Sequence, residues 1–316
     1  MIGKIGSGII VVLLSICMIA LISNVRAVVA QDVYPTIHLN PAVNVAVQDE
    51  YFNLSVMISD VLSLWSYQIY LSYSPDVLEI ARNQSTMDYY VYQGDFLKRG
   101  AFSTFWVSKV NNTAGTLQAW ESLVSPAPAV EGNGELLRVV FKVKNAGSSF
   151  IHLYNTDLRT KYNIPIVHQT TDGILTTLSN AITQEIEWQT VQVETNSSLL
   201  DMQFSQPDKA IFLTVSGAYG TSGFVIAVIP ISLLGAQEGN WTVLIDDSPV
   251  MPLIGGNSTH SFIYVSYTHS TRVIGIYGTE AIPEYSIIVI FPVIFLMGTV
   301  IVGRSKKRTR QRIGKS

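Results

Sequence analysis

Cysteine is almost missing from this chain of 316 residues: the single one, Cys17, lies in an apolar N-terminal segment. The residues outside that segment therefore cannot form an internal disulfide or a thiolate metal site, and they contain no cysteine nucleophile. Histidine is also scarce, and no histidine has a close partner at metal-ligand spacing, so we expect no metal or other cofactor. We expect these five side chains on the surface or in turns: His38, His152, His168, His260 and His269.

Basic residues are rare in the middle of the chain. Residues 31–285 hold 23 acidic and 11 basic side chains, a formal charge of −12. A nucleic-acid-binding protein needs a basic face, so this composition argues against a nucleic-acid partner.

Catalytic motifs are missing as well. The chain has no G-x-S-x-G elbow and no G-x-x-x-x-G-K phosphate loop. Glu185 and Glu187 flank Ile186 in a strand-like segment, which would point both carboxylates to one side. Two acids on a short polar segment are more typical of a solvated face than of a glycosidase pair. Asp246 and Asp247 indicate a hairpin turn rather than a calcium site, and residues 268–271 also indicate a hairpin turn. We predict that the chain is not an enzyme.

Long apolar runs are present only at the two ends. Residues 1–30 combine Lys4, an apolar run and small residues before Gln31, which predicts a secretory signal peptide, with an uncleaved signal anchor as the alternative. Residues 286–303 carry no charge and would span about 27 Å as a helix, enough for one transmembrane helix. The basic tail, 304–316, predicts a cytoplasmic C-terminus and an extracellular middle at the cell membrane.

The segment that precedes the predicted helix contains Pro283, Glu284 and Tyr285. It resembles archaeal C-terminal sorting signals with a Pro-Glu-Phe motif, an apolar helix and a basic tail, although Tyr285 replaces the phenylalanine. The resemblance implies that the tail is exchanged for a lipid anchor. A plain stop-transfer helix is the alternative, and both arrangements tether the protein at the outer face of the membrane.

The middle of the chain alternates apolar and polar residues with period two, as half-buried strands do. The clearest runs are 52–59, 65–73 and 137–144, and turn residues separate them. Ser74-Pro75-Asp76 predicts a sharp corner, because proline cannot continue a central ladder and its two neighbours favour turns. The fold class is therefore all-β, with strands that form a sandwich or barrel. We expect Trp106 and Trp120 to pack in the core.

The corner LSYSPDVLEI, the later GDFL at 94–97 and GELLRVVFKVK at 134–144 together resemble a cohesin domain over residues 34–178. The resemblance implies a jelly-roll β-sandwich that binds a dockerin-like protein through one sheet face. Residues 179–197 are expected to be a polar connector with a candidate strand at 181–193. Residues 198–280 predict a smaller, immunoglobulin-like β-sandwich next to the membrane. Its segment from TVLIDDSPV at 242–250 to YTHSTRVIGIYGT at 267–279 resembles membrane-proximal modules of archaeal surface proteins.

Six N-x-S/T sequons lie in the part expected to face outward, and an exported sequon is a glycosylation acceptor. They begin at Asn53, Asn83, Asn111, Asn196, Asn240 and Asn257. An insert with Tyr89, Tyr90 and Tyr92 is a candidate for sugar stacking. We therefore expect a glycosylated, membrane-anchored module that recognises a surface protein, either dockerin-like or part of a surface layer. The alternative is a polysaccharide-binding protein linked to polysaccharide breakdown.

Overall fold

The computed structural model describes residues 34–282. Four predicted features lie outside these residues: the signal peptide (1–30), the sorting motif at Pro283, Glu284 and Tyr285, the transmembrane helix (286–303) and the basic tail. Between residues 34 and 282, no helix is both long enough and apolar enough to cross a membrane.

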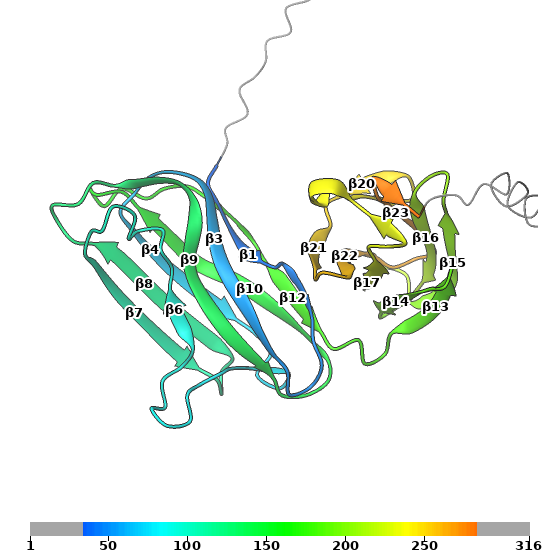
Figure 1. Ribbon diagram of the computed structural model, residues 1–316, viewed down its shortest axis with the longest axis horizontal. Coiled ribbons are helices and arrows are strands. Elements are labelled where there is room, and N and C mark those ends of the chain that lie inside the picture. The colour runs from blue at the N-terminus through cyan, green and yellow to red at the C-terminus, as the bar shows by residue number, and fades with distance from the viewer. Residues whose placement is uncertain (1–33, 283–316) are drawn as a thin grey trace, which may run out of the picture. The chain divides into compact units, whose positions relative to one another are not determined.

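The first part of the described chain folds into two sheets that enclose one apolar core, here called the first sandwich (Figure 1). One sheet has the order β11-β1-β3-β9-β5, and β6 also pairs with β9. Its strands are β1 (Thr36–Asn40), β3 (Tyr51–Leu64), β5 (Leu78–Ile80), β6 (Val91–Gln93), β9 (Val130–Val143) and β11 (Gln169–Thr171). The facing strands run in the order β2-β12-β10-β4-β8-β7. They are β2 (Val43–Val45), β4 (Ser66–Ser72), β7 (Thr104–Asn111), β8 (Thr116–Leu123), β10 (Ser148–Arg159) and β12 (Gly173–Thr176).

Period-two alternation explains the core of this sandwich. The apolar side chains at alternate positions of β3, namely Leu54, Val56 and Ile58, are fully buried. On β4, in the opposite sheet, Ile69 and Leu71 are also fully buried. The sequence prediction of strands at 52–59, 65–73 and 137–144 is confirmed, and β3 and β9 extend beyond the predicted runs.

The predicted corner at residues 74–76 lies between β4 and β5. The backbone N–H groups of Val77 and Leu78 both donate to the Ser74 carbonyl oxygen, at 3.2 and 2.9 Å. The Lys144 ammonium donates to the Pro75 carbonyl oxygen at 2.7 Å. Leu78 then returns to the core, fully buried. The corner is therefore closed by its own backbone and fastened to the end of β9.

The second sandwich also consists of two main sheets. One contains β13 (Ile182–Ile186), β14 (Gln189–Thr195), β17 (Ser222–Pro230), β22 (His260–Thr268) and β21 (Leu253–Gly256), in that order. The other contains β15 (Ser198–Ser205), β16 (Ala210–Ser216), β23 (Arg272–Tyr277), β19 (Thr242–Ile245) and β20 (Ser248–Val250), in that order. Two short strands, β18 (Leu234–Gly235) and β24 (Glu280–Ala281), pair with each other, and Gln237–Gly239 forms a 3₁₀ helix.

Two local expectations change in this region. The segment 179–197, expected to be a polar connector with one candidate strand, supplies the two strands of the β13–β14 hairpin, and β14 pairs with β17. Residues 268–271, expected to be a hairpin turn, connect two strands that do not pair with each other, since β22 pairs with β17 and β21 while β23 pairs with β16 and β19.

His269 explains why this connection is fixed. It lies in the bend between the two strands, a turn position as expected, but its side chain is buried, with 5% exposed. Its Nε2 lies 2.7 Å from the Ser197 hydroxyl, and its Nδ1 is hydrogen-bonded to the Thr221 hydroxyl. A side-chain carbon at Gly223 would lie 2.6 Å from the imidazole ring, so the glycine provides the space. The buried ring ties the connection between the sheets to two neighbouring segments.

One strand pair joins the two sandwiches. β2 pairs with β12 on one side and, through Val43 and Gly255, with β21 on the other. A side-chain carbon on Gly255 would come within 1.9 Å of the Val43 carbonyl oxygen, so this close approach requires glycine. The sheet order is therefore continuous from β13 to β7.

Candidate functional site

The outward surface of β10, β4, β8 and β7 carries a row of aromatic side chains. Strand register places Tyr154 beside Tyr70, and Gln68 beside Trp120. The ring centroid of Tyr70 lies 6.3 Å from that of Trp120 and 5.6 Å from that of Tyr154. The His152 ring stacks on Tyr154 at 6.0 Å. We call Trp120, Tyr70, Tyr154 and His152 the aromatic ridge.

Trp120 was expected in the core, and that expectation is wrong. Leu117, Ala119 and Leu123 alternate with it along β8 and are buried, so the period-two rule directs Trp120 outward. The indole Nε1 donates to the Gln68 side-chain oxygen at 2.7 Å, which holds the ring across the neighbouring strand. The period-two alternation along β8 therefore predicts the outward position of Trp120. The core assignment was based on the size of its side chain instead.

Behind the aromatic ridge lies a buried carboxylate. Glu121 is 2% exposed and accepts hydrogen bonds from the Tyr67 hydroxyl, at 2.8 Å, and from the Gln93 amide. Burial raises the pKa of Tyr67 well above its usual value, and the nearby Glu121 raises it further. The hydroxyl also lies against the Leu136 carbonyl oxygen. Trp106 packs inward beside Tyr67, as expected. This network ties β4, β8 and β9 together and gives the ridge a fixed support.

The edge strand β7 extends the apolar part of this surface. Phe105 and Val107 are 66% and 39% exposed. A shallow hollow of about 210 Å³ lies in the surface, with Phe105, Trp120, Gln68 and Asp157 among its lining residues. Aromatic residues at the centre with polar groups around them are the composition of a protein-binding patch.

The three tyrosines expected to stack on sugars do not form one platform. Tyr90 and Tyr92 are stacked on each other, with centroids 6.3 Å apart and planes 13° apart, and Tyr92 is 49% exposed. Tyr89 lines a groove of about 750 Å³ that neither of the other two lines. Sugar stacking by these residues stays a prediction.

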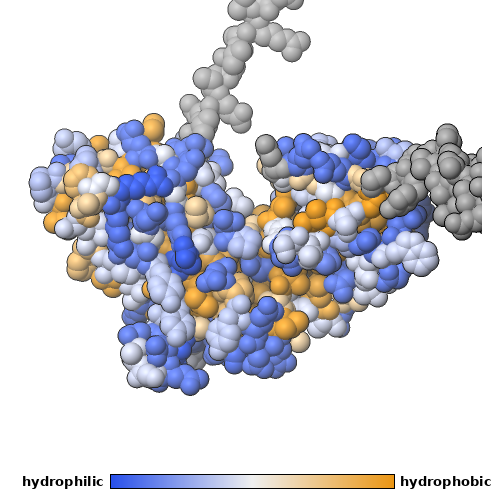
Figure 2. All heavy atoms as spheres, in the orientation of Figure 1, coloured by the Kyte–Doolittle hydropathy of each residue, from blue (hydrophilic) through white to orange (hydrophobic). Residues whose placement is uncertain are grey.

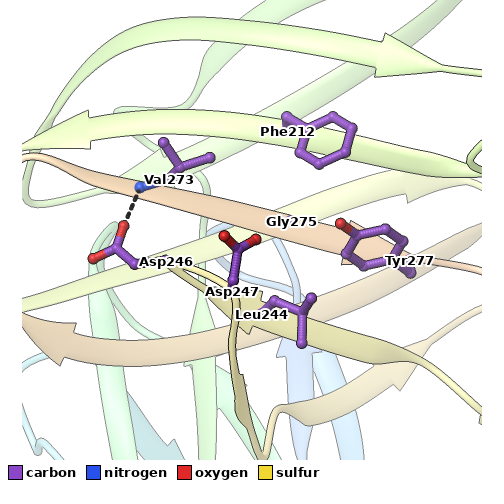
Figure 3. A pocket seen from close by; sticks show the side chains of 7 residues that line it. All are labelled: Phe212, Leu244, Asp246, Asp247, Val273, Gly275 and Tyr277. Carbon is purple, nitrogen blue, oxygen red and sulfur yellow. Dashed lines mark hydrogen bonds between the residues drawn. The ribbon is translucent and has the colours of Figure 1, made fainter.

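The second sandwich carries a hollow of about 310 Å³ on the outward surface of β16, β23 and β19 (Figure 3). Register places Phe212 and Leu244 on either side of Gly275, which leaves the middle of the row empty. Tyr277 closes one end, and its ring meets Phe212 edge-on at 5.8 Å. Asp247 borders the opening.

The turn beside this hollow is the hairpin that the sequence predicts. Asp246 and Asp247 have φ values of 49° and 62°, the left-handed pair that a two-residue hairpin loop requires. Asp246 accepts the backbone N–H of Val273 at 3.0 Å and the guanidinium of Arg272 at 2.6 Å. These two bonds lower the pKa of Asp246, and the bond from Val273 has the larger effect.

The paired carboxylates considered at Glu185 and Glu187 do not share a strand face. Strand β13 ends at Ile186, and Glu187 forms the hairpin turn with Trp188, with φ values of 48° and 65°. Glu185 instead accepts the Thr190 hydroxyl. Among residues 34–282, no three His, Cys, Asp or Glu side chains gather closely enough to hold a metal ion.

The predicted glycosylation sites differ in how their amides are bonded. Five are exposed and Asn83 is half-buried. The side-chain oxygens of Asn83, Asn111 and Asn257 accept backbone N–H groups that follow in their own sequons, which leaves the amide nitrogen free to be modified. The Asn196 amide nitrogen donates to the Ser222 carbonyl oxygen at 3.0 Å. Use of all six sites stays a prediction.

Comparison with known proteins gives likenesses to solved structures only. No family model and no curated protein matches this chain. A non-cellulosomal cohesin from the archaeon Archaeoglobus fulgidus is 19% identical, with a TM-score of 0.36, over 45% of this chain and 90% of that one. A type II cohesin module from an adaptor scaffoldin of Acetivibrio cellulolyticus is 21% identical, with a TM-score of 0.38, over 46% and 90%. A type I cohesin–dockerin complex from Clostridium thermocellum is similar at 11% identity, with a TM-score of 0.37, over 48% and 97%.

Proposed function

We propose that this chain is a binding and display module that recognises a protein partner through the aromatic ridge. The observation that carries the proposal is the outward position of Trp120 and Tyr70 on a sheet face. Tryptophan and tyrosine dominate the energetic centres of protein interfaces. The sequence resemblance to cohesins, which bind through a sheet face, points in the same direction.

The ring geometry favours a protein over a polysaccharide on this face. Successive sugars stack best on rings that lie in one plane. Tyr70 meets Trp120 at 80° and Tyr154 at 48°, so the ridge is corrugated. A corrugated apolar row suits the side chains of a partner that interdigitate with it.

The partner belongs to the cell envelope, as a dockerin-like or surface-layer protein. This part of the proposal follows from the sequence of the ends, which predicts export, a single C-terminal membrane helix and a cytoplasmic basic tail. The module would then stand outside the membrane, and its sequons would carry glycans.

The test compares two pairs of variants in the full chain. The partner is first captured from the envelope of the source cell, identified and purified. The pair Tyr70→Ala and Trp120→Ala should weaken its binding by about 100-fold or more, since each hot-spot truncation costs about 2 kcal/mol. The control pair is Tyr90→Ala and Tyr92→Ala, which removes two aromatic rings from another surface and should leave the affinity unchanged.

Two results would contradict the proposal. One is unchanged partner binding by a Tyr70→Ala, Trp120→Ala protein whose melting curve matches that of the wild type. The other is a polysaccharide that binds the wild type but not the Tyr70→Ala, Trp120→Ala protein, because the face would then be a sugar-binding face.

A further inference from the structure

A second surface of the first sandwich is an open groove of about 750 Å³ that shares no residue with the aromatic ridge. One wall is the insert that follows β5, the cyan loop at the lower edge of the first sandwich in Figure 1. The other walls come from β3, β9 and the end of β7. The volume is in the range of small-molecule and cofactor sites, about 300–1,000 Å³.

The floor of the groove is held by one side chain. The Asn112 amide oxygen accepts the Ile80 N–H at 2.9 Å and the Tyr73 hydroxyl at 2.6 Å. Its amide nitrogen donates to the Ile80 carbonyl oxygen at 3.0 Å. Asn112 therefore fastens the β7–β8 turn to β5 and leaves the side chains above it in fixed places.

Cationic groups line this groove in a region that is otherwise acidic. Arg82, Lys109 and Lys142 are three of the 11 basic residues in residues 31–285. Lys142 pairs with Asp49 at 2.9 Å. Arg82 and Lys109 make no side-chain hydrogen bond or ion pair with the described residues. Two unpaired cations in one groove are suited to an anionic ligand.

The charge is not uniform, and the remaining walls are aromatic and polar. Glu79 lies in the same cross-strand row as Lys142 and Tyr51, so one carboxylate faces the groove. Tyr51 is 57% exposed, and Tyr89 is half-buried on the other wall. Aromatic rings offer an apolar face to the carbon–hydrogen side of a sugar, while amides and cations bind its oxygens.

We propose that this groove binds an acidic polysaccharide, with Arg82 and Lys109 on its carboxylates and Tyr51 and Tyr89 against its rings. The formal charge of −12 over residues 31–285 repels a polyanion from the rest of the surface. Among residues 34–282, binding is therefore expected at this cationic groove, and it weakens as salt is added. The proposal goes beyond protein recognition by the aromatic ridge and does not depend on it.

The experiment measures binding of polygalacturonate by the full chain, with neutral dextran as the reference polymer. The protein is made in a host that attaches no N-glycans, because Asn111 lies in the groove and is a predicted glycosylation site. The wild type should bind polygalacturonate at low salt and not dextran. The pair Arg82→Gln and Lys109→Gln should weaken binding about tenfold or more, since hydrogen bonds to charged groups are among the stronger ones.

Matched variants keep charge and aromatic effects apart. Lys98→Gln removes an exposed cation outside the groove and should change the affinity less than twofold. Tyr51→Ala should weaken binding, whereas Tyr92→Ala should not. Trp120→Ala should leave polygalacturonate binding intact, so this proposal and protein recognition by the ridge can fail separately.

Three outcomes would overturn the proposal. Absence of polygalacturonate binding at low salt is the first. The second is equal loss of binding in Lys98→Gln and in the groove pair, which would indicate attraction without a site. The third is poly-glutamate binding as tightly as polygalacturonate, with the same dependence on Arg82 and Lys109, which would assign the groove to acidic peptides.

Discussion

Each sandwich has an outward sheet face on which a row of side chains crosses three neighbouring strands. The two faces differ in the residue at the centre of that row. On the first, Trp120 stands between Gln68 and Val107 and belongs to a raised aromatic ridge. On the second, Gly275 stands between Phe212 and Leu244, and the same place is a hollow. Both faces follow from period-two alternation. One side chain therefore decides whether a sheet face offers a ridge to a large partner or a depression to a small group.

The surrounding surface does not distinguish the two sandwiches as clearly. Figure 2 shows hydrophilic residues over much of the drawn face of the first sandwich, with hydrophobic residues in smaller groups among them. Exposed apolar side chains occur in both parts, for example Phe105 and Val273. Isolated residues of this kind are normal on soluble proteins, and the connected row of rings is the distinctive feature.

Filling the hollow should give the larger of two stability effects. In Gly275→Val, the new Cβ would lie 2.8 Å from the Tyr277 ring, so the ring must move and its edge contact with Phe212 is lost. We expect a loss of about 0.5–1.5 kcal/mol in the free energy of unfolding, which is the contribution of one aromatic pair. Urea denaturation followed by circular dichroism measures this change.

The control is the same substitution in a chain with Tyr277→Ala. Because the obstructing ring is then absent, Gly275→Val should cost less there than in the wild type, which a double-mutant cycle quantifies. Equal losses in the free energy of unfolding in both backgrounds would show that the Tyr277 ring does not limit the size of the side chain at position 275.

The smallest effect should appear at the turn beside the hollow. The pKa of Asp246 is lowered in the folded state, so its contribution to stability is present above its unfolded pKa and is lost as the pH falls through the folded value. Asn suits the left-handed turn as well as Asp does. Asp246→Asn should therefore be less stable than the wild type at pH 7 by a few tenths of a kcal/mol, since the carboxylate is partly exposed.

The difference between Asp246→Asn and the wild type should shrink as the pH falls below about 4, where an ordinary aspartate is protonated. Urea midpoints at several pH values measure it. A difference that stays constant from pH 7 to pH 2 would show that ionisation of Asp246 does not stabilise the fold. Arg272→Gln removes the ion pair with Asp246 and the hydrogen bond to the Thr268 carbonyl oxygen. It should retain part of the pH dependence, because Val273 still donates to Asp246.

The sequence was sufficient for strands and corners, because these depend on neighbours along the chain. The alternation at Leu54, Val56 and Ile58 and the corner at Pro75 are of this kind. The sequence was insufficient where the hydrogen-bond partners of a residue are distant from it along the chain. The connection at His269 depends on Ser197 and Thr221, which a local turn signal cannot reveal.

The candidate sites were harder to predict for a physical reason. Trp120 was assigned to the core by its size, although its neighbours Leu117 and Ala119 already filled the inward positions of β8. The groove was only partly foreseen, through Tyr89. Its cations, Arg82 and Lys109, lie far apart in the sequence and meet only when β7 and the insert come together. Spacing along the chain cannot predict such a site.

The most direct test of the central claim is a hydrogen–deuterium exchange footprint of the full chain with and without its purified protein partner. Binding should slow exchange in β4, β8 and β7, around Tyr70, Trp120 and Val107, and leave β16, β23 and β19 unchanged. Protection confined to the second sandwich, with β4 and β8 exchanging as in the free protein, would contradict recognition through the aromatic ridge.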